Sequence, residues 1–205
     1  MFTPMNSMLV ISNVLYFLAL INPVSKVFIL CTLQPPCSHR ELAMLSVRST
    51  VVAFLILLVL TICGDFLLRD VFRVDIYSLK IAGGLVLFLI GLTAVRRGRF
   101  FEETLARSSD ISIVPLAVPL LAGPGTMTGA ISFASEYGII LTLICITLAL
   151  AINLGIMLFS ARIGKALERM HATGPLIRIT GLIVATVAVQ MVLDGLSKWI
   201  CVYLR

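Results

Sequence analysis

A broken apolar stretch near the middle of the chain places the tightest limit on its fold. Residues 113–130 are apolar enough to lie in a bilayer, yet they contain three prolines and three glycines. Proline lacks the amide donor and clashes with the carbonyl four residues earlier, so one continuous helix through Pro119 and Pro124 is disfavoured. Broken backbone survives in lipid only where protein or water covers it. The stretch predicts either a kinked packing helix or two half-helices that meet in mid-membrane, the second with Gly123 as its N-cap and Pro124 as its first residue.

The composition of the chain places it in a membrane. It is 60% hydrophobic and 13% charged, with a mean hydropathy of +1.09, whereas soluble domains average about 45–50% apolar and about 25% charged residues. The net charge of +6 does not indicate binding of nucleic acid, because the basic residues lie in short loops between apolar runs. The five cysteines form no CxxC pair, and no metal site is predicted. The expected partners are the lipid bilayer and a small-molecule substrate.

Apolar runs along the chain predict six transmembrane spans. They cover about residues 8–33, 47–68, 78–95, 113–134, 139–160 and 176–196. The polar stretch 96–110 is expected to be a cytoplasmic linker within one membrane domain. It separates a first three-helix repeat, residues 1–95, from a second, residues 111–205. A second polar stretch, residues 161–175, is expected to be a loop.

Basic residues are distributed unequally between the two sides that six spans would create. The loops after spans one, three and five contain nine of them: Arg40, Arg48, Arg96, Arg97, Arg99, Arg107, Arg162, Lys165 and Arg169. The opposite side contains four: Arg69, Arg73, Lys198 and Arg205. Because short cytoplasmic loops carry the excess of Lys and Arg, both termini are predicted to be periplasmic.

The two halves of the chain repeat each other in sequence. When LKIAGGLV in the third span is aligned with IRITGLIV in the sixth, Lys80 matches Arg178 and Gly83 matches Gly181. Each half has three spans, so the second half would enter the membrane from the opposite side. Such inverted repeats are typical of secondary transporters, whose binding sites form where discontinuous helices meet.

The breaks in spans one and four correspond in the same way. Asn22-Pro23-Val24-Ser25 matches Gly123-Pro124-Gly125-Thr126, and asparagine and glycine are both good N-cap residues. The predicted fold class is therefore an all-α integral membrane protein. Its six transmembrane helices form two inverted three-helix repeats, with spans one and four broken at Asn22-Pro23 and at Gly123-Pro124-Gly125.

The two breaks together predict a binding site for a small carboxylate. In the inverted arrangement, the half-helices after Pro23 and Pro124 both begin near the central plane of the membrane. A helix N-terminus presents free N–H groups and roughly half a positive charge, which favours an anion. Bulk at Gly125 is expected to block the substrate while leaving the fold intact. The predicted substrate-binding residues are Asn22, Pro23, Ser25, Gly123, Pro124, Gly125, Thr126 and Thr128.

Residues beside the predicted site leave two interpretations open. Lys26, four residues beyond Asn22, either lines the inner path or extends its ammonium group to the membrane interface. Gly83, Gly84 and Gly181 either line the path or permit close helix packing.

Charged residues nearer the outer surface are expected to be interfacial. Lys80 should extend to the interface, and Asp194 and Lys198, four residues apart, should form a pair on one helix face. Since no carboxylate falls near mid-membrane, ion coupling is expected to use sodium rather than protons, with the carbonyl of Leu18, freed by Pro23, as a ligand. No other cofactor is expected.

Four segments of the sequence resemble the MarC family of bacterial inner-membrane proteins. They are ALINPVSKVF, LKIAGGLVLFLIGL, IVPLAVPLLAGPGTM and RITGLIVATVAVQMVLDGL, and the resemblance covers nearly the whole chain. It implies six spans, a place among the LysE-like exporters and a location in the bacterial inner membrane, and some members are described as transporters of small neutral amino acids. The family motif of Asp or Asn before Pro matches Asn22-Pro23. The sequence departs from the family at Ser25, where many members have Gly, and at Lys26, where many have an apolar residue.

Two functional classes follow from these observations. The first is a secondary transporter, for uptake or export, of small neutral amino acids or similar small zwitterions. The alternative is a non-transporting multi-pass protein that acts as a subunit or assembly factor. An enzyme is not expected, because the chain contains neither HExxH nor GxSxG, and both its histidines fall in predicted loops. The sequence leaves homo-oligomer formation open.

Overall fold

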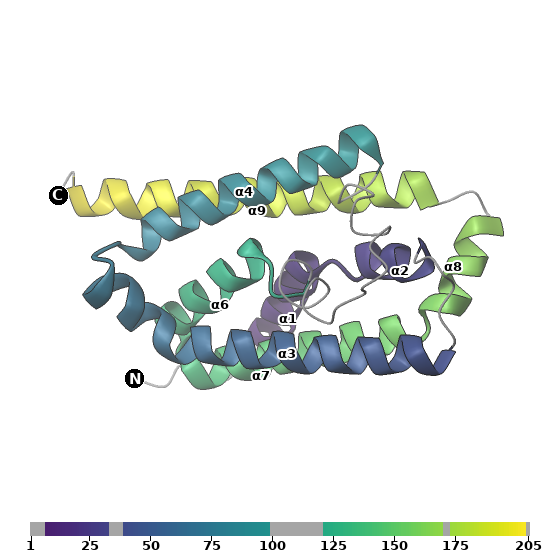
Figure 1. Cartoon of the computed structure of the whole chain (residues 1–205). Coiled ribbons are helices and arrows are strands. Elements are labelled where there is room, and N and C mark those ends of the chain that lie inside the picture. Colours follow the sequence, from purple (N-terminus) through teal and green to yellow (C-terminus); the bar gives the residue numbers. More distant parts are fainter. Residues whose placement is uncertain (1–6, 33–38, 99–120, 170–172, 204–205) are drawn as a thin grey trace.

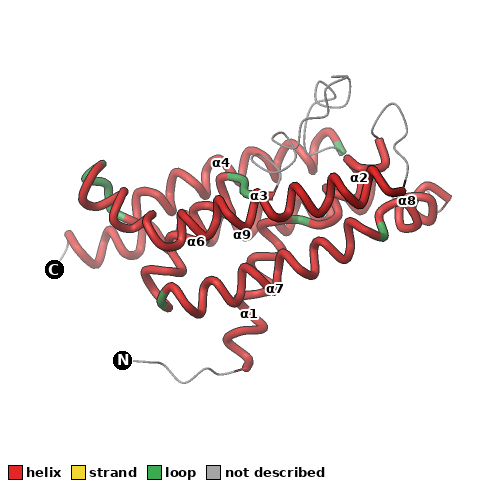
Figure 2. The backbone as a smooth tube through the Cα atoms, turned by 60° about the horizontal axis from the view of Figure 1, so that its bottom comes forward, coloured by secondary structure: helices red, strands yellow, loops and turns green. Residues whose placement is uncertain are grey.

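The helices of the chain form one elongated bundle. The structure, a computed structural model, describes residues 7–32, 39–98, 121–169 and 173–203, which are helical apart from short turns (Figure 2). The described elements are α1 (Ser7–Ile21), α2 (Pro23–Thr32), α3 (His39–Phe66), the π-helical η1 (Leu67–Val71), α4 (Ile76–Arg97), α6 (Pro124–Tyr137), α7 (Ile139–Leu158), α8 (Ser160–Arg169) and α9 (Thr173–Tyr203).

The long helices α3, α4, α7 and α9 run along the same axis (Figure 1). We call one end of the bundle the turn end, where residues 72–75 join η1 to α4 and Gly138 joins α6 to α7. The opposite end is the loop end, where α4 finishes and where α3 and α9 begin. α8 lies across the loop end, beside α2. The short helices α1, α2 and α6 lie between the α4–α9 pair and the α3–α7 pair (Figure 1).

The structure confirms a multi-pass, all-helical membrane protein in its described part. Five segments there are long and apolar enough to cross a membrane: Ser7–Cys31, Arg40–Val71, Ile76–Arg97, Ile139–Leu158 and Thr173–Val202. They match predicted spans one, two, three, five and six. The predicted fourth span lies partly outside the described residues, and its second half is α6. The number of six spans and the linker 96–110, most of which is not described, therefore stay predictions.

Some predicted boundaries are wrong because they were drawn from apolar residues alone. α3 begins at His39, eight residues before the predicted start of the second span, and its 28 residues correspond to about 42 Å of helix. Apolar runs mark only the hydrocarbon core, about 30 Å thick, whereas helical hydrogen bonds continue into the interface. The loop predicted at residues 161–175 is also wrong, since most of it belongs to α8 and to the start of α9. Polar sequence is compatible with a surface helix that buries only one face.

α4 and α9 pack with their backbones in close contact. A Cβ atom at Gly84 would lie 2.8 Å from the carbonyl oxygen of Ala188, and one at Gly91 would lie 2.8 Å from that of Gly181. At Gly181 itself, a Cβ would lie 2.7 Å from Cβ of Ala94. Small residues permit this approach, which is the usual basis of helix association in membranes. The structure thus assigns Gly84 and Gly181 to packing. The two helices are antiparallel (Figure 1), as expected for equivalent spans of an inverted repeat.

The outer surface of the bundle is apolar. Along α3, Val51, Leu55, Val59 and Ile62 are all exposed, and along α9 Ile179 and Leu182 are exposed. In water such a surface would be an aggregation hazard, but in a bilayer it faces lipid tails. The buried positions lie between the helices, where they include Phe17, Ile146 and Met157.

Candidate functional site at two helix breaks

The first predicted break is present and is built around Asn22. α1 ends at Ile21 and α2 begins at Pro23, while Asn22 adopts a left-handed conformation with φ of 54°. Asparagine is one of the few residues other than glycine that visit this region readily. Its Oδ1 accepts a long hydrogen bond of 3.4 Å from the Ser25 amide, as an N-cap does. The predicted roles of Asn22 as cap and Pro23 as first helical residue are therefore correct.

The second predicted break has the same design with a different cap. α6 begins at Pro124, and Gly123 is its N-cap in an extended conformation, with φ of −76° and ψ of 173°. The Gly123 carbonyl accepts the first helical hydrogen bond from the Met127 amide at 2.9 Å. The residues before Leu121 lie outside the described part, so the first half of the fourth span is not described.

A hydroxyl three residues after each cap bonds back to the cap carbonyl. Ser25 Oγ donates to the Asn22 carbonyl at 2.8 Å, and Thr126 Oγ1 donates to the Gly123 carbonyl at 2.9 Å. Thr126 Oγ1 also lies 3.0 Å from the Leu121 carbonyl. Both hydroxyl protons are therefore used inside the breaks. The repetition of cap, proline and hydroxyl is a structural counterpart of the sequence repeat.

The two broken spans contact each other directly. Leu20, two residues before the first break, would lie 3.4 Å from a Cβ atom at Gly125 and 2.9 Å from one at Gly129. Further along the same helices, the rings of Tyr16 and Phe133 stack with centroids 4.9 Å apart. α1 and α6 are thus neighbours with no other helix between them at these contacts.

Two of the glycine and threonine residues in the predicted site serve packing. A Cβ at Gly125 would lie 2.9 Å from Leu87 Cδ1, so larger residues there displace Leu87 and Leu20. Since the displaced atoms are the ends of flexible leucine side chains, the expectation that bulk at Gly125 leaves the fold intact stays a prediction. Thr128 is buried against Gly83 of α4, where a Cβ atom would collide with the threonine side chain. Gly83 thus belongs to the α4–α6 contact.

The first break also contains two polar groups with unused hydrogen-bond donors. Asn22 is 6% exposed, and its buried Nδ2 has no hydrogen-bond acceptor in the described part of the chain. Lys26, one turn later, is 4% exposed, so its ammonium group does not extend to the interface. Its Nζ lies 3.2 Å from Ser25 Oγ, and no ion pair joins it to a carboxylate among the described residues.

The sodium ligand expected at Leu18 is wrong. The Leu18 carbonyl accepts the Asn22 amide at 2.8 Å, so it keeps its helical partner. The carbonyl that loses its donor to Pro23 is that of Ala19, four residues earlier. In the part of the chain that the structure describes, no cluster of His, Cys, Asp and Glu could hold a metal ion.

A network at the turn end was not predicted from the sequence. Glu136 of α6 accepts hydrogen bonds from Lys80 of α4, at 2.5 Å, and from Lys198 of α9. Asp194 instead accepts from Gln190 at 2.7 Å, so the predicted Asp194–Lys198 pair is wrong. Burial by itself would raise the pKa of Glu136, but the hydrogen bonds from Lys198 and Lys80 outweigh it and lower the pKa. The partners are 56 and 62 residues apart in sequence, so no local spacing could reveal the network.

A cavity of about 320 Å³ lies beside the first break, lined by residues of α2, α7, α8 and α9. Pro23, Val24 and Val27 of α2 line one side, and Ile163 and Leu167 of α8 line another. Its volume is at the lower end of the range of small-molecule sites, and most of its lining is apolar. The cavity could not be predicted from the sequence, because one of its walls is α8, where a loop is expected.

Comparison with known proteins places the chain among membrane proteins of bacteria and archaea. A family model described as "MarC family integral membrane protein" matches residues 7–200. A UPF0056 membrane protein of Archaeoglobus fulgidus is 34% identical over 84% of both chains. One of Pyrococcus horikoshii is 31% identical over 91% of this chain and 92% of the relative. YvbG of Bacillus subtilis is 27% identical over 87% of this chain and 90% of its own. No solved structure matches the chain.

Proposed function

The chain belongs to the MarC family of integral membrane proteins, and we propose that it is a secondary transporter of small solutes that carry a carboxylate. Small neutral amino acids and similar small zwitterions are the substrates expected from the sequence. The observation that carries the proposal is the pair of broken helices, which contact each other through Leu20 inside a bundle of spans. Broken backbone is costly in lipid, and transporters retain it where it lines a substrate path.

The half-helices supply the physical means of holding a carboxylate. The first turn of each half-helix holds amides without an intrahelical acceptor, although the Ser25 amide of α2 already donates to Asn22. Each N-terminus also presents roughly half a positive charge. Such amides can donate hydrogen bonds to a carboxylate even where no cationic side chain is present. Leu20 and Leu87 fill the region beside Gly125, so a substrate held there has to be small.

The two ends of the bundle fit a conformation that is closed at one end and hollow at the other. At the turn end, Glu136 ties α6 to α4 and α9 through Lys80 and Lys198. Toward the loop end, the 320 Å³ cavity reaches Pro23 at the break. In the proposed cycle, the α4–α9 pair is the rigid element, and release of Glu136 opens the turn end.

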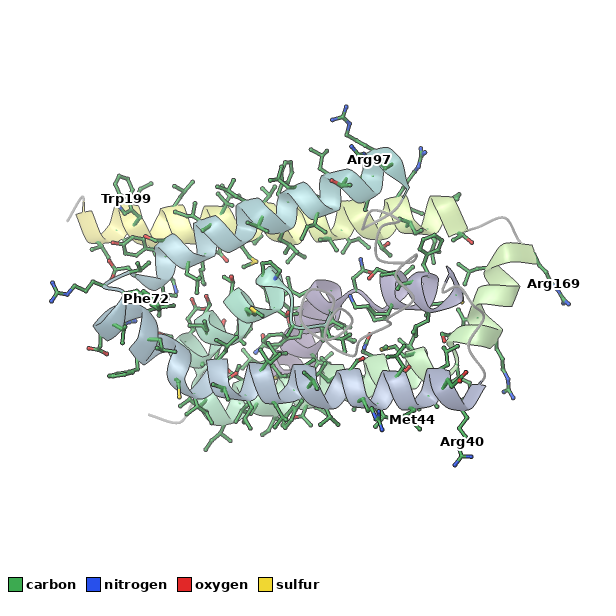
Figure 3. The ribbon with its side chains drawn as sticks, in the orientation of Figure 1. Arg40, Met44, Phe72, Arg97, Arg169 and Trp199 are labelled. Carbon is green, nitrogen blue, oxygen red and sulfur yellow. The ribbon has the colours of Figure 1, made fainter. Side chains whose placement is uncertain are left out.

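The distribution of arginine gives the proposed orientation. Arg40, Arg97 and Arg169 lie at the loop end, whereas Phe72 and Trp199 lie at the turn end (Figure 3). We expect the loop end to face the cytoplasm of a bacterial cell, with both termini on the periplasmic side of the inner membrane. A reporter that is active only outside the cytoplasm, fused after Arg205, tests this orientation. Activity of a cytoplasm-only reporter at that position would reverse it.

Transport by purified protein in liposomes tests the function. Labelled alanine should enter or leave liposomes that contain the protein faster than protein-free liposomes, with and without a sodium gradient across the membrane. Acceleration that depends on the gradient would identify sodium as the coupling ion. Equal rates with and without protein, for every small neutral amino acid tried, would refute amino-acid transport and favour the alternative of a non-transporting subunit.

A further inference from the structure

The position of Lys26 sets the first break apart from ordinary helix breaks in membranes. Its side chain is in the first turn of α2, and the residue is 4% exposed. The one hydrogen bond that the structure gives its Nζ is with Ser25 Oγ, at 3.2 Å. That hydroxyl already donates its proton to the Asn22 carbonyl, so it acts as an acceptor for Lys26.

Among the described side chains, the helices around α2 offer Lys26 no carboxylate. α2 and α7 contain neither Asp nor Glu. The single acid of α9, Asp194, is near its turn end and accepts from Gln190. α8 packs against the loop half of α2, and its acid, Glu168, has a side chain outside the described part. A buried ammonium group without a counter-ion is strongly disfavoured, so Lys26 is either neutral or paired with an anion that the described residues do not supply, and an anionic ligand would stabilise its charged form.

Asn22 Nδ2 is a second donor at the same place, and it is independent of Lys26. It is buried and has no acceptor among the described residues, although the Oδ1 of the same amide caps α2. A buried donor without an acceptor costs about 1–3 kcal/mol, so an unpaired one calls for an explanation. The unpaired Asn22 amide, the Lys26 ammonium group with its single neutral partner and the N-terminus of α2 together fit one small anion.

The carbonyls at the two breaks offer the ammonium group of a zwitterion few acceptors. The Leu18 and Asn22 carbonyls accept from Asn22 N–H and from Ser25, respectively. Across the contact, the Gly123 and Leu121 carbonyls accept from Thr126. The Ala19 carbonyl, which loses its helical donor to Pro23, is left to accept from an ammonium group. An amino group on the substrate can therefore be held at the first break, but the two side-chain donors there recognise the carboxylate alone.

We propose that Lys26 Nζ and Asn22 Nδ2 bind a carboxylate, so that the substrate class is the small monocarboxylate anion, with or without an amino group. This inference rests on the proposed function, because it names the substrate class of the same site. The second break offers no cationic side chain, since Met127 stands where the repeat would place a counterpart of Lys26.

Competition for labelled alanine uptake in liposomes tests the inference without any variant. Pyruvate, which has a carboxylate and no amino group, should compete with alanine and should itself be taken up. Alaninamide, which has the amino group and no carboxylate, should not compete. Competition by alaninamide together with none by pyruvate would overturn the inference while leaving amino-acid transport standing.

Lys80 offers a matched control for the variant Lys26→Met. Both lysines are buried in apolar spans, at 4% and 6% exposed, but Lys80 is paired with Glu136. Lys26→Met should lower pyruvate uptake at least about tenfold, the loss expected when a hydrogen bond between charged partners is removed. Lys80→Met should keep the preference for pyruvate over alaninamide. Wild-type pyruvate uptake by Lys26→Met protein would overturn the assignment.

Binding to detergent-solubilised protein separates failure of the site from failure of transport. Sodium pyruvate should raise the Tm of wild-type and Lys80→Met protein above the value in sodium chloride, and should not raise that of Lys26→Met. This pattern without any transport would refute the proposed function and support the site. Equal stabilisation by chloride, or none by pyruvate in the wild type, would overturn the carboxylate assignment.

Discussion

The two helix breaks share one scaffold and differ in the groups attached to it. Each has a cap residue, a proline at the first helical position and a hydroxyl that donates to the cap carbonyl. The first break adds a left-handed asparagine with a spare amide and a buried lysine, Lys26. The second has Gly123 as its cap and Met127 in the place of the lysine. The second break shows that a helix can be interrupted in this bundle without a charged side chain. The interruption itself therefore does not explain Lys26 and the spare Asn22 amide at the first break, and we assign both to the binding of a ligand.

Exchange of the two cap residues should give the largest difference between the breaks. Asn22→Gly keeps the left-handed backbone at little cost, because glycine adopts it freely and is itself an acceptable cap, within about a few tenths of a kcal/mol. It removes the spare amide, so pyruvate uptake should fall at least about tenfold while Tm barely changes. In the reciprocal variant Gly123→Asn, the substituted residue lies in extended backbone that any residue adopts. Pyruvate uptake by this variant should therefore stay near the wild-type value. Equal loss in both variants would mean that the breaks contribute alike.

Removal of the two hydroxyl groups should affect the free energy of unfolding differently at the two breaks. Thr126→Val leaves the Leu121 carbonyl without the donor that the structure gives it, whereas the Gly123 carbonyl retains the Met127 amide. Because Lys26 Nζ also donates to Ser25 Oγ, both variants are made in Lys26→Met protein, where Ser25→Ala affects only the Asn22 carbonyl, which retains the Ser25 amide. We expect Thr126→Val to lower the free energy of unfolding by about 1–3 kcal/mol and Ser25→Ala by less. Denaturation in detergent measures both, and a larger loss in Ser25→Ala would contradict this reading of the caps.

The smallest effect should come from Glu136, whose ion pairs with Lys80 and Lys198 form a tether between the C-terminal end of α6 and the helices α4 and α9. Because its pKa is lowered in the folded protein, Glu136 contributes stability that is present above the usual carboxyl range and is lost as pH falls through the lowered value. Tm should therefore fall as the pH drops below the usual carboxyl range, and Glu136→Gln should remove that part of the pH dependence. An unchanged pH profile in Glu136→Gln would show that the tether does not stabilise the folded state.

The breaks themselves were predictable from the sequence because their causes are local. Proline removes a donor wherever it stands, and asparagine or glycine before it supplies a cap, so Asn22-Pro23 and Gly123-Pro124 could be located without any knowledge of neighbours. The apolar runs of the five described spans were predictable for the same reason.

What the sequence could not supply depends on contacts between distant segments. Glu136 of α6 joins lysines of α4 and α9, and Leu87 of α4 occupies the space beside Gly125, so neither contact could be recognised from spacing along the chain. The burial of Lys26 likewise depends on how α2 packs, and sequence alone left two interpretations for that lysine. α8 could not be predicted from hydropathy, because its polar sequence is equally typical of a loop.

A distance between bound substrate and Lys26 tests the central claim most directly. Solid-state NMR can measure the dipolar coupling between pyruvate labelled with ¹³C at its carboxylate and protein labelled with ¹⁵N at lysine Nζ, in liposomes. Hydrogen-bond geometry predicts a separation of about 4 Å or less between the carboxylate carbon and Nζ of Lys26. The coupling should persist in Lys80→Met and disappear in Lys26→Met. Bound pyruvate that shows no coupling to Lys26, or the same coupling in Lys26→Met, would contradict the account.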